Sequence, residues 1–286
     1  MPIRLVAIDL DGTLLDSRST ISPANRQALA EVAAKGIQIA VVTGRRFQSA
    51  RKILKEIPCP VTLISSNGAM IGTASGEILH RDFLPRRIAW RVLESAREYR
   101  PYAVAIFDVP DRGQVVMQKG ATSEGPLGWY LANSPEHLLQ VPDLVESLTS
   151  DPIQLMFGGP PDRVGPIEPF LRAAFNPLEF HLTWTKYLAR NLSILDVMNR
   201  GCSKGRALES WAARCAISAS DVMAIGDNYN DLEMLHFCGH PVLMGNSSFG
   251  LARPDWPVTL SNDQDGVARA LETYVLGQSK TAGPTP

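Results

Sequence analysis

Short, nearly continuous apolar runs alternate with segments of helical spacing over the first 84 residues of the chain. The apolar runs cover residues 5–8, 37–43 and 61–65, and the helical segments begin at Ser22-Pro23 and at residue 47. Apolar runs of four to eight residues that end in turn-forming residues are typical of buried strands. Such strands in alternation with helices predict a doubly wound parallel sheet.

The pattern changes after about residue 84. Two apolar runs, 103–107 and 114–118, are joined by a Pro/Gly-containing turn, which predicts a hairpin. Further strands are expected at 153–157, 179–185 and 192–197, and helices at 86–99 and 165–175. Hairpins mixed with helices predict an α+β unit with an antiparallel sheet.

The alternation of helix and strand resumes towards the C-terminus. Helices are expected at 204–215, 229–237 and 264–276, and strands at 221–226 and 241–244. We therefore predict an α/β protein with a Rossmann-like, doubly wound core in two parts, residues 1–84 and 191–277, around an inserted α+β domain at 85–190. The polar, Pro/Gly-rich residues 278–286 predict a flexible tail.

Composition narrows the choice of partners. The 286 residues are 45% hydrophobic and carry a net charge of −1, from 28 Lys and Arg against 29 Asp and Glu. This balance provides no field that would recruit nucleic acid or an anionic membrane, so an anionic substrate needs a local site.

The cysteines and the lengths of the apolar runs bear on the cellular compartment. The four cysteines are scattered and form no C-x-x-C pair, which predicts free thiols in a reducing cytoplasm. We expect neither a signal peptide nor a membrane span, because no apolar run has the required length. The oligomeric state is left open by the sequence.

Polar residues follow the expected strands at their carboxyl ends. Asp9 and Asp11 follow the first strand, Thr43 ends the second, and Asp227 follows the strand at 221–226. In an open parallel sheet, ligands bind at this edge. Two carboxylates this close repel each other, so a metal ion, a shared proton or a cationic partner must hold them.

Four groups of residues carry the candidate chemistry. They are Asp9-x-Asp11-Gly-Thr13, Thr43-Gly-Arg45, Ser203-Lys204-Gly205 and Gly226-Asp227-Asn-Tyr-Asn-Asp231. A carboxylate is a competent nucleophile for phosphorus once the surrounding negative charge is neutralised. A hard, oxygen-bound cation such as Mg²⁺ would do this, and Lys204 and Thr43 would contact the phosphoryl oxygens.

These groups, in this order, resemble the haloacid dehalogenase (HAD) superfamily and within it the Cof-type subclass IIB phosphatases. The resemblance is carried by AIDLDGTLL, VVTGR, SSNGA, CSKGRAL, GDNYNDLEML and the late SNDQDGVARAL. It implies a HAD-type phosphoric monoester hydrolase that uses Mg²⁺ and an aspartyl-phosphate intermediate. The substrate would be a small phosphorylated metabolite, either a sugar phosphate or a phosphorylated cofactor. The inserted domain would be a cap that closes over the substrate and sets specificity.

The resemblance also implies a role for each matching carboxylate. Asp9 would be the nucleophile, and Asp11 the general acid and later the general base. The side chains of Asp9 and Asp227 and the backbone carbonyl of Asp11 would hold the metal, supported by Asp231.

The remaining candidates would bind the substrate. This set contains Thr43, Gly44, Arg45, Asn67, Lys204 and Asn230, of which Thr43 and Lys204 are also catalytic. Arg45 either reaches the substrate or pairs with an acid on the surface. Asn67 is a substrate contact or a left-handed turn residue, and Asn230 orients Lys204 or the phosphate or is an ordinary first-turn residue. Asn246 either contributes to the rim of the site or lies in a turn, and we expect the turn.

Two other functions share parts of this arrangement. A phosphomutase of the same superfamily would use the same nucleophile, acid and metal and return the phosphoryl group to a sugar. A phospho-accepting signalling module also places acids, a hydroxyl and a lysine around Mg²⁺. Such a module is short and does not need an inserted domain of about a hundred residues.

Overall fold

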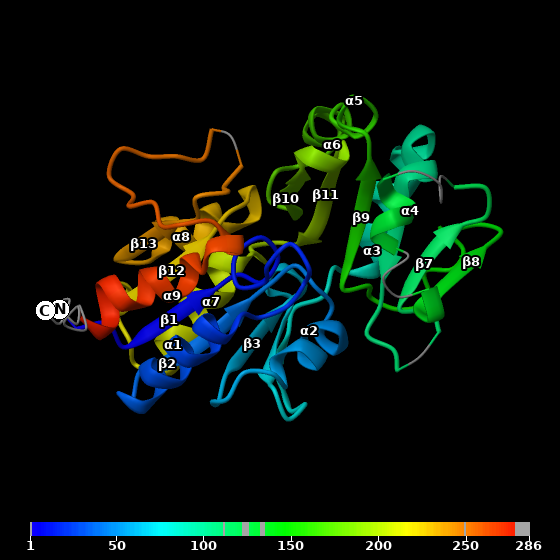
Figure 1. The fold of residues 1–286 in the computed structure, drawn as a ribbon. Helices are drawn as coiled ribbons and strands as arrows, with labels where there is room; N and C mark the ends of the chain where they lie inside the picture. Colours follow the sequence, from blue (N-terminus) through cyan, green and yellow to red (C-terminus); the bar gives the residue numbers. More distant parts are fainter. Residues whose placement is uncertain (1, 111, 122–125, 132–134, 249, 278–286) are drawn as a thin grey trace, which may run out of the picture. The chain divides into compact units, whose positions relative to one another are not determined.

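The structure is a computed structural model that describes residues 2–110, 112–121, 126–131, 135–248 and 250–277. The expected tail at 278–286 lies outside the described residues. The chain divides into two compact units (Figure 1). Unit 1 contains Met1–His80 and Lys204–Pro286, and unit 2 contains Arg81–Ser203.

Unit 1 is built on a seven-stranded sheet in the order β13-β12-β1-β2-β3-β4-β5. Its strands are β1 (Leu5–Ile8), β2 (Gln38–Val42), β3 (Thr62–Ser65), β4 (Met70–Thr73), β5 (Ile78–Arg81), β12 (Val222–Gly226) and β13 (His240–Leu243). The strands from β13 to β3 pair in parallel, which confirms the predicted fold class of the core. Strand β4 runs antiparallel to β3. This antiparallel extension was not predicted, because Gly72 and Gly76 interrupt the apolar pattern.

Helices cover both faces of this sheet. They are α1 (Pro23–Ala34), α2 (Phe47–Leu54), α7 (Lys204–Arg214), α8 (Leu232–Phe237) and α9 (Gly266–Leu271). On one face, Leu5 and Ala7 of β1 join a buried cluster with Leu208 of α7 and Met234 of α8. Helices α1 and α9 contact each other outside that cluster (Figure 1). As predicted, α1 has a serine cap, and the Ser22 hydroxyl accepts a hydrogen bond from the third residue of the helix.

The position of β1 in the sheet determines where the site lies. Strand β1 pairs with β2 on one side and with β12 on the other. The strand order therefore reverses direction at β1, and the crevice outside the carboxyl ends of strands at such a point is where α/β proteins bind ligands. Asp9, Thr43 and Asp227 follow the ends of these three neighbouring strands.

Unit 2 contains a six-stranded sheet in the order β10-β11-β9-β6-β7-β8. Its strands are β6 (Ala103–Ile106), β7 (Val115–Gln118), β8 (Leu138–Val141), β9 (Gln154–Gly159), β10 (Phe180–Tyr187) and β11 (Leu192–Asn199). The predicted hairpin is present, since β6 and β7 are antiparallel. Strand β8 pairs in parallel with β7, so the sheet is mixed and not antiparallel throughout.

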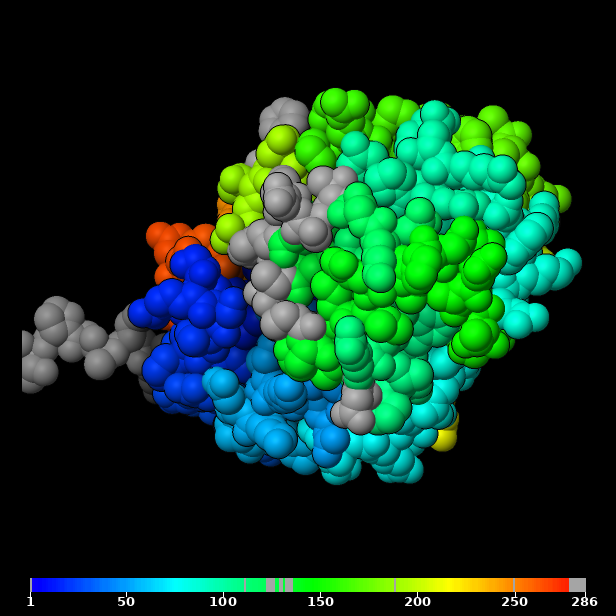
Figure 2. Space-filling model, turned by 90° about the vertical axis from the view of Figure 1, so that its right-hand side faces the viewer, coloured from blue at the N-terminus to red at the C-terminus, as the bar shows by residue number. Residues whose placement is uncertain are grey.

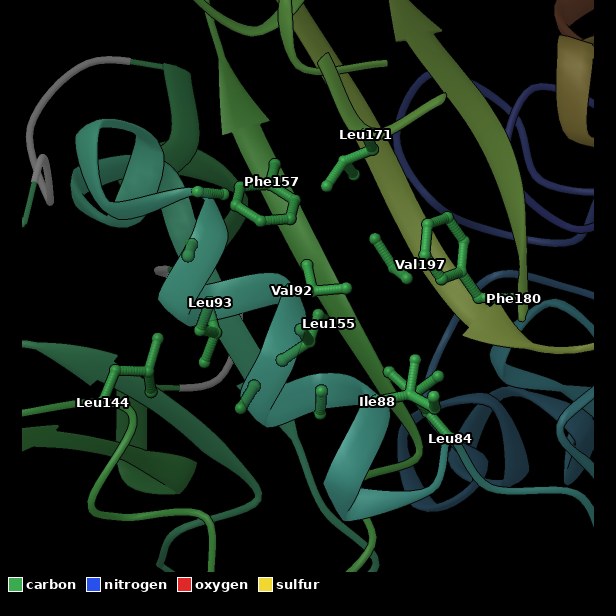
Figure 3. Packing of buried hydrophobic residues seen from close by; sticks show 14 of the residues in the cluster. Leu84, Ile88, Val92, Leu93, Leu144, Leu155, Phe157, Leu171, Phe180 and Val197 are labelled. Atoms are coloured by element: carbon green, nitrogen blue, oxygen red, sulfur yellow. The ribbon is translucent and has the colours of Figure 1, made fainter. Parts of the chain in front are cut away.

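Several helices pack on this sheet in the core of unit 2. The helices are α3 (Arg86–Ser95), α4 (Pro126–Leu131), α5 (Pro161–Val164) and α6 (Ile167–Ala174). Ile88 and Val92 of α3 belong to one buried cluster with Leu155 and Phe157 of β9 (Figure 3). Figure 2 shows the face of unit 2 that the teal to green segments form. In the described parts of both units, no helix is long and apolar enough to cross a membrane.

The first boundary between the units lies after His80, four residues before the expected one, and the second boundary differs more. Strand β11 pairs with both β10 and β9, so it belongs to the sheet of unit 2. The chain therefore enters the second part of unit 1 at Lys204, whereas the sequence pattern placed residues 191–203 in the core. The physical reason is that a buried apolar strand looks the same in either sheet, and only its long-range pairing decides where it belongs.

Candidate active site

Lys204 and Asp9 form a buried ion pair at the end of β1. The ammonium group of Lys204 donates to Asp9 Oδ1 and to Asp231 Oδ1, both at 2.6 Å. Lys204 is 1% exposed and is the first residue of α7. A cation at a helix N-terminus is disfavoured by the helix dipole, so its position depends on these two carboxylates.

Asp227 approaches the loop after β1 closely. Its Oδ1 accepts a hydrogen bond of 3.0 Å from the hydroxyl of Thr13. A Cβ atom at Gly12 would lie 2.5 Å from Asp227 Oδ2, and Gly12 has a φ of +83°. Both the backbone conformation and the close approach therefore require glycine at this position.

Asp231 holds the turn that follows β12. Its Oδ2 accepts hydrogen bonds from the backbone N–H groups of Asp227, at 3.0 Å, and Asn228, at 2.9 Å. Its other oxygen accepts from Lys204. Both oxygens already have donors, which fits the supporting role that the resemblance implies for this residue.

The three carboxylates carry more negative charge than Lys204 neutralises. Burial, together with the charges of Asp231 and Asp11, raises the pKa of Asp9 to about 7 although Lys204 opposes this. Burial and the charges of Asp9 and Asp231 also raise the pKa of Asp227 well above its ordinary value. Burial would lower the pKa of Lys204, but the charges of Asp231 and Asp9 outweigh it and raise that pKa.

This donor set fits a hard divalent cation. Asp9, Asp227 and Asp231 each offer a carboxylate oxygen, and these oxygens lie within 4.8 Å of one another. Mg²⁺ is bound by few carboxylates and keeps some of its water. Its charge would offset the burial and the repulsion that raise the two pKa values. The expected metal site therefore agrees with the chemistry of the residues present.

Asp11 has a different environment from Asp9. Its carboxylate accepts two hydrogen bonds from the guanidinium of Arg45, 2.7 Å from Nε and 2.5 Å from Nη2. The two side chains are partly exposed, 33% for Asp11 and 27% for Arg45. Of the two alternatives for Arg45, the structure shows the pairing with an acid. A substrate contact by Arg45 stays a prediction.

The remaining predicted residues gather at the ends of β2 and β3. Thr43 is fully buried, and its hydroxyl accepts a 3.1 Å hydrogen bond from the backbone N–H of Arg45. Asn67 adopts the left-handed conformation, with φ 52° and ψ 29°, and its Oδ1 accepts from the side-chain amide of Asn230 at 2.9 Å. A Cβ at Gly44 would lie 3.1 Å from Asn67 Oδ1. The backbone N–H of Asn67 also donates to the carbonyl of Thr43 at 3.0 Å, so these four positions lie together.

Several polar residues of the site had no predicted role. The hydroxyls of Ser65 and Ser66 are buried and have no hydrogen-bond partner within the described residues. Like Asn67, they lie at the end of an apolar strand, and this position in the sequence could have marked them as candidate site residues. Thr13 was visible as part of the first motif, but its bond to Asp227 joins residues 214 positions apart and has no local signal.

The fold and the site together define an α/β enzyme with an acidic, lysine-containing centre at the reversal point of its sheet. The chain belongs to the haloacid dehalogenase-like hydrolase family, whose model matches residues 6–271. It is 28% identical to phosphatase YwpJ of Bacillus subtilis, over 94% of this chain and 99% of that protein. It is 25% identical to pyridoxal phosphate phosphatase YbhA of Escherichia coli, over 96% of this chain and 100% of that protein.

A solved structure shows the same fold. A haloacid dehalogenase-like hydrolase from B. subtilis, 24% identical, superposes with a TM-score of 0.77 over 94% of this chain and 99% of that chain. The predicted superfamily and the predicted enzyme class, a phosphoric monoester hydrolase, are confirmed.

Proposed function

We propose that this protein is a Mg²⁺-dependent phosphatase that hydrolyses a small phosphate monoester through an aspartyl phosphate on Asp9. The observation that carries the proposal is the contrast between two carboxylates one residue apart. Asp9 is buried against Lys204, whereas Asp11 is partly exposed and held by Arg45. One carboxylate is thus fixed for attack, and the other lies outside the metal-binding group and can serve a leaving alcohol.

The reaction has two steps. In the first, an oxygen of Asp9 attacks phosphorus and the bond to the alcohol oxygen breaks. Asp11, which must first take up a proton and give up at least one of its two hydrogen bonds from Arg45, passes that proton to the alcohol oxygen. In the second, Asp11 takes a proton from water as the water attacks phosphorus, and the bond to Asp9 breaks to release inorganic phosphate. Lys204 and Thr43 donate hydrogen bonds to the phosphoryl oxygens throughout. Mg²⁺ held by the side chains of Asp9 and Asp227 and the backbone carbonyl of Asp11, with support from Asp231, would supply charge neutralisation.

We further propose that the substrate is a sugar phosphate or a phosphorylated cofactor. The relative that acts on pyridoxal phosphate supports the second class. Unit 2 contains none of the residues to which the reaction gives a role, so we assign to it the selection of the substrate and not the chemistry. The test is a screen of the purified protein against phosphorylated metabolites with Mg²⁺, with Asp9→Asn as the blank. Phosphate release must occur without a sugar bisphosphate activator, and a long-lived phosphorylated Asp9 without turnover would contradict the proposal.

Removal of divalent cations with EDTA is expected to abolish turnover reversibly. The excess negative charge of Asp9 and Asp227 also predicts that Mg²⁺ stabilises the fold, because an ion that binds only the folded state raises its stability. The measurements are phosphate release and melting temperature in EDTA and after addition of Mg²⁺. Asp227→Asn is the control and should lose most of the Mg²⁺-dependent rise in melting temperature. Undiminished turnover in EDTA would contradict this role.

Arg45→Gln is expected to lower kcat about tenfold while KM changes by less than about threefold, because the bidentate bond fixes the acid and not the substrate. Arg45→Lys keeps the charge but not the two parallel bonds, so its kcat should be intermediate. Steady-state kinetics on one substrate give both constants. A raised KM with an unchanged kcat would instead make Arg45 a substrate contact.

A further inference from the structure

The loop after β1 is held by side chains from the far end of the chain. We call residues 10–17, which carry Asp11, the acid loop. Within unit 1, the side-chain amide of Asn246 donates to the carbonyl of Gly12 at 2.8 Å, and that of Asn262 donates to the carbonyl of Leu15 at 2.8 Å. Residues outside the four candidate motifs thus help to hold this loop in place.

The two asparagines are also joined to each other. The side-chain oxygen of Asn246 accepts a hydrogen bond of 2.9 Å from the backbone N–H of Asn262. Next in sequence, the carboxylate of Asp263 accepts from the backbone N–H of Ser17 at 2.7 Å. The acid loop is therefore bonded at Gly12, Leu15 and Ser17 by one connected group of side chains.

The turn that presents this group has a fixed shape. Residues 261–266 correspond to the late SNDQDG motif, to which the proposed reaction gives no role. Asp265 adopts the left-handed conformation, with φ 56° and ψ 37°. A Cβ at Gly266 would lie 2.2 Å from the carbonyl oxygen of Leu260, so the start of α9 packs directly on the backbone of the preceding segment. A strained residue of this kind persists only where its surroundings determine it, and such residues cluster at functional sites.

The contacts of Asn246 require an amide, whereas those of Asn262 require a side-chain donor. A carboxamide offers a donor and an acceptor at once, and Asn246 uses both. Asn246 is exposed and Asn262 is half-buried, so neither side chain fills the core. Hydrogen bonds at exposed positions add little to stability, because water replaces them. The bonds are better explained by the loop conformation that they select.

We infer that Asn246 and Asn262 are positioning residues that hold the acid loop so that Asp11 meets the leaving oxygen. The inference rests on the proposed function. Proton transfer needs the acid within hydrogen-bond distance of the leaving oxygen, and a displacement of about 1 Å can cost up to about a hundredfold in rate. The late motif would thus act on catalysis through Asp11 without touching the substrate.

The test uses Asn246→Asp and Asn262→Asp, which keep the side-chain shape but place an acceptor against each carbonyl. Activity is measured with phenyl phosphate, whose leaving group needs a proton, and with 4-nitrophenyl phosphate, whose leaving group needs one far less. We expect kcat/KM to fall about 10- to 30-fold for the first and at most about threefold for the second. Asp11→Asn should show the same selective pattern, and combining it with Asn262→Asp should add little further loss.

Gln264→Ala is the matched control in the same turn. Its side chain accepts a hydrogen bond from the Ser261 hydroxyl at 2.9 Å and, among the described residues, makes no hydrogen bond to the acid loop, so both substrates should be hydrolysed as by the wild type. Asn246→Ser is the second variant if an aspartate variant does not fold, and melting temperatures identify that case.

The outcomes separate the two hypotheses. Equal losses on both substrates, or no loss on either, would overturn the positioning role. If the wild type releases no phosphate, or if Asp9→Asn retains turnover, the proposed function itself fails. A wild type that is active, an inactive Asp9→Asn and unaltered Asn246 and Asn262 variants would overturn the inference alone.

Discussion

Asp9→Asn is expected to lower kcat by about a thousandfold or more, because an amide cannot form the phosphorylated intermediate and loss of a nucleophile removes the reaction path. The fold should survive, since an asparagine has the same size and can still accept a hydrogen bond from Lys204. Phosphate release with Mg²⁺ measures the first effect, and circular dichroism the second. Residual turnover above about one per cent of the wild-type rate would contradict the role of Asp9 as nucleophile.

The same substitution has a pH-dependent effect on stability in EDTA. Burial is the main cause that raises the pKa of Asp9 from its ordinary 3.8 to about 7. Between these values the folded state keeps a proton that the unfolded state has released, so wild-type stability falls as pH rises through this range. The amide in the variant does not titrate. The variant should therefore melt above the wild type at about pH 8, with the difference vanishing near pH 4; a constant difference would contradict the assigned cause.

Lys204→Met is expected to lower kcat by about a hundred- to a thousandfold and to destabilise the fold by about 3–5 kcal/mol in EDTA. Methionine is nearly as long as lysine but leaves Asp9 and Asp231 buried without the ammonium that bonds both at 2.6 Å. Kinetics with Mg²⁺ and urea unfolding in EDTA measure the two effects.

Lys55→Met is the matched control, because Lys55 is an exposed lysine of the same unit. It should change neither quantity by a measurable amount. Mg²⁺ should restore part of the stability of Lys204→Met, since it neutralises the same carboxylates. If Lys204→Met and Lys55→Met are equally stable in EDTA, the buried charges are compensated by something other than Lys204.

The local hydrophobic pattern was sufficient to predict the strands that end at the candidate site. The apolar run at 5–8, ended by two carboxylates and a glycine, predicts both a buried strand and a polar group at its tip, and β1 has the predicted bounds. The sequence also placed Thr43 and Asp227 at the ends of strands, and the structure shows that these strands flank β1. Parallel strands run in the same direction, so residues predicted at their carboxyl ends are expected at the same edge of the sheet.

Long-range pairing was not predictable in the same way. Strand β11 looks like any buried strand, and only its partners β9 and β10 assign it to unit 2. The pairing of β8 parallel to β7 likewise has no local signal. The sequence favoured neither of the two alternatives for Arg45, because the reach of a long side chain depends on the three-dimensional geometry. The bonds of Asn246 and Asn262 to the acid loop span 234 and 247 residues and could not be inferred from either segment.

The pairing of β1 with β12 has a consequence for the order in which the chain can fold during synthesis. Leu5 lies beside Val222, so β1 can pair with β12 only after more than two hundred further residues have been synthesised. Unit 2 is continuous, from Arg81 to Ser203, and is complete before that partner exists. Domains fold as units while the chain emerges, and closing a long loop slows the pairing that depends on it. The inserted unit can thus become compact first, while Lys204 and Asp227 are still to be synthesised.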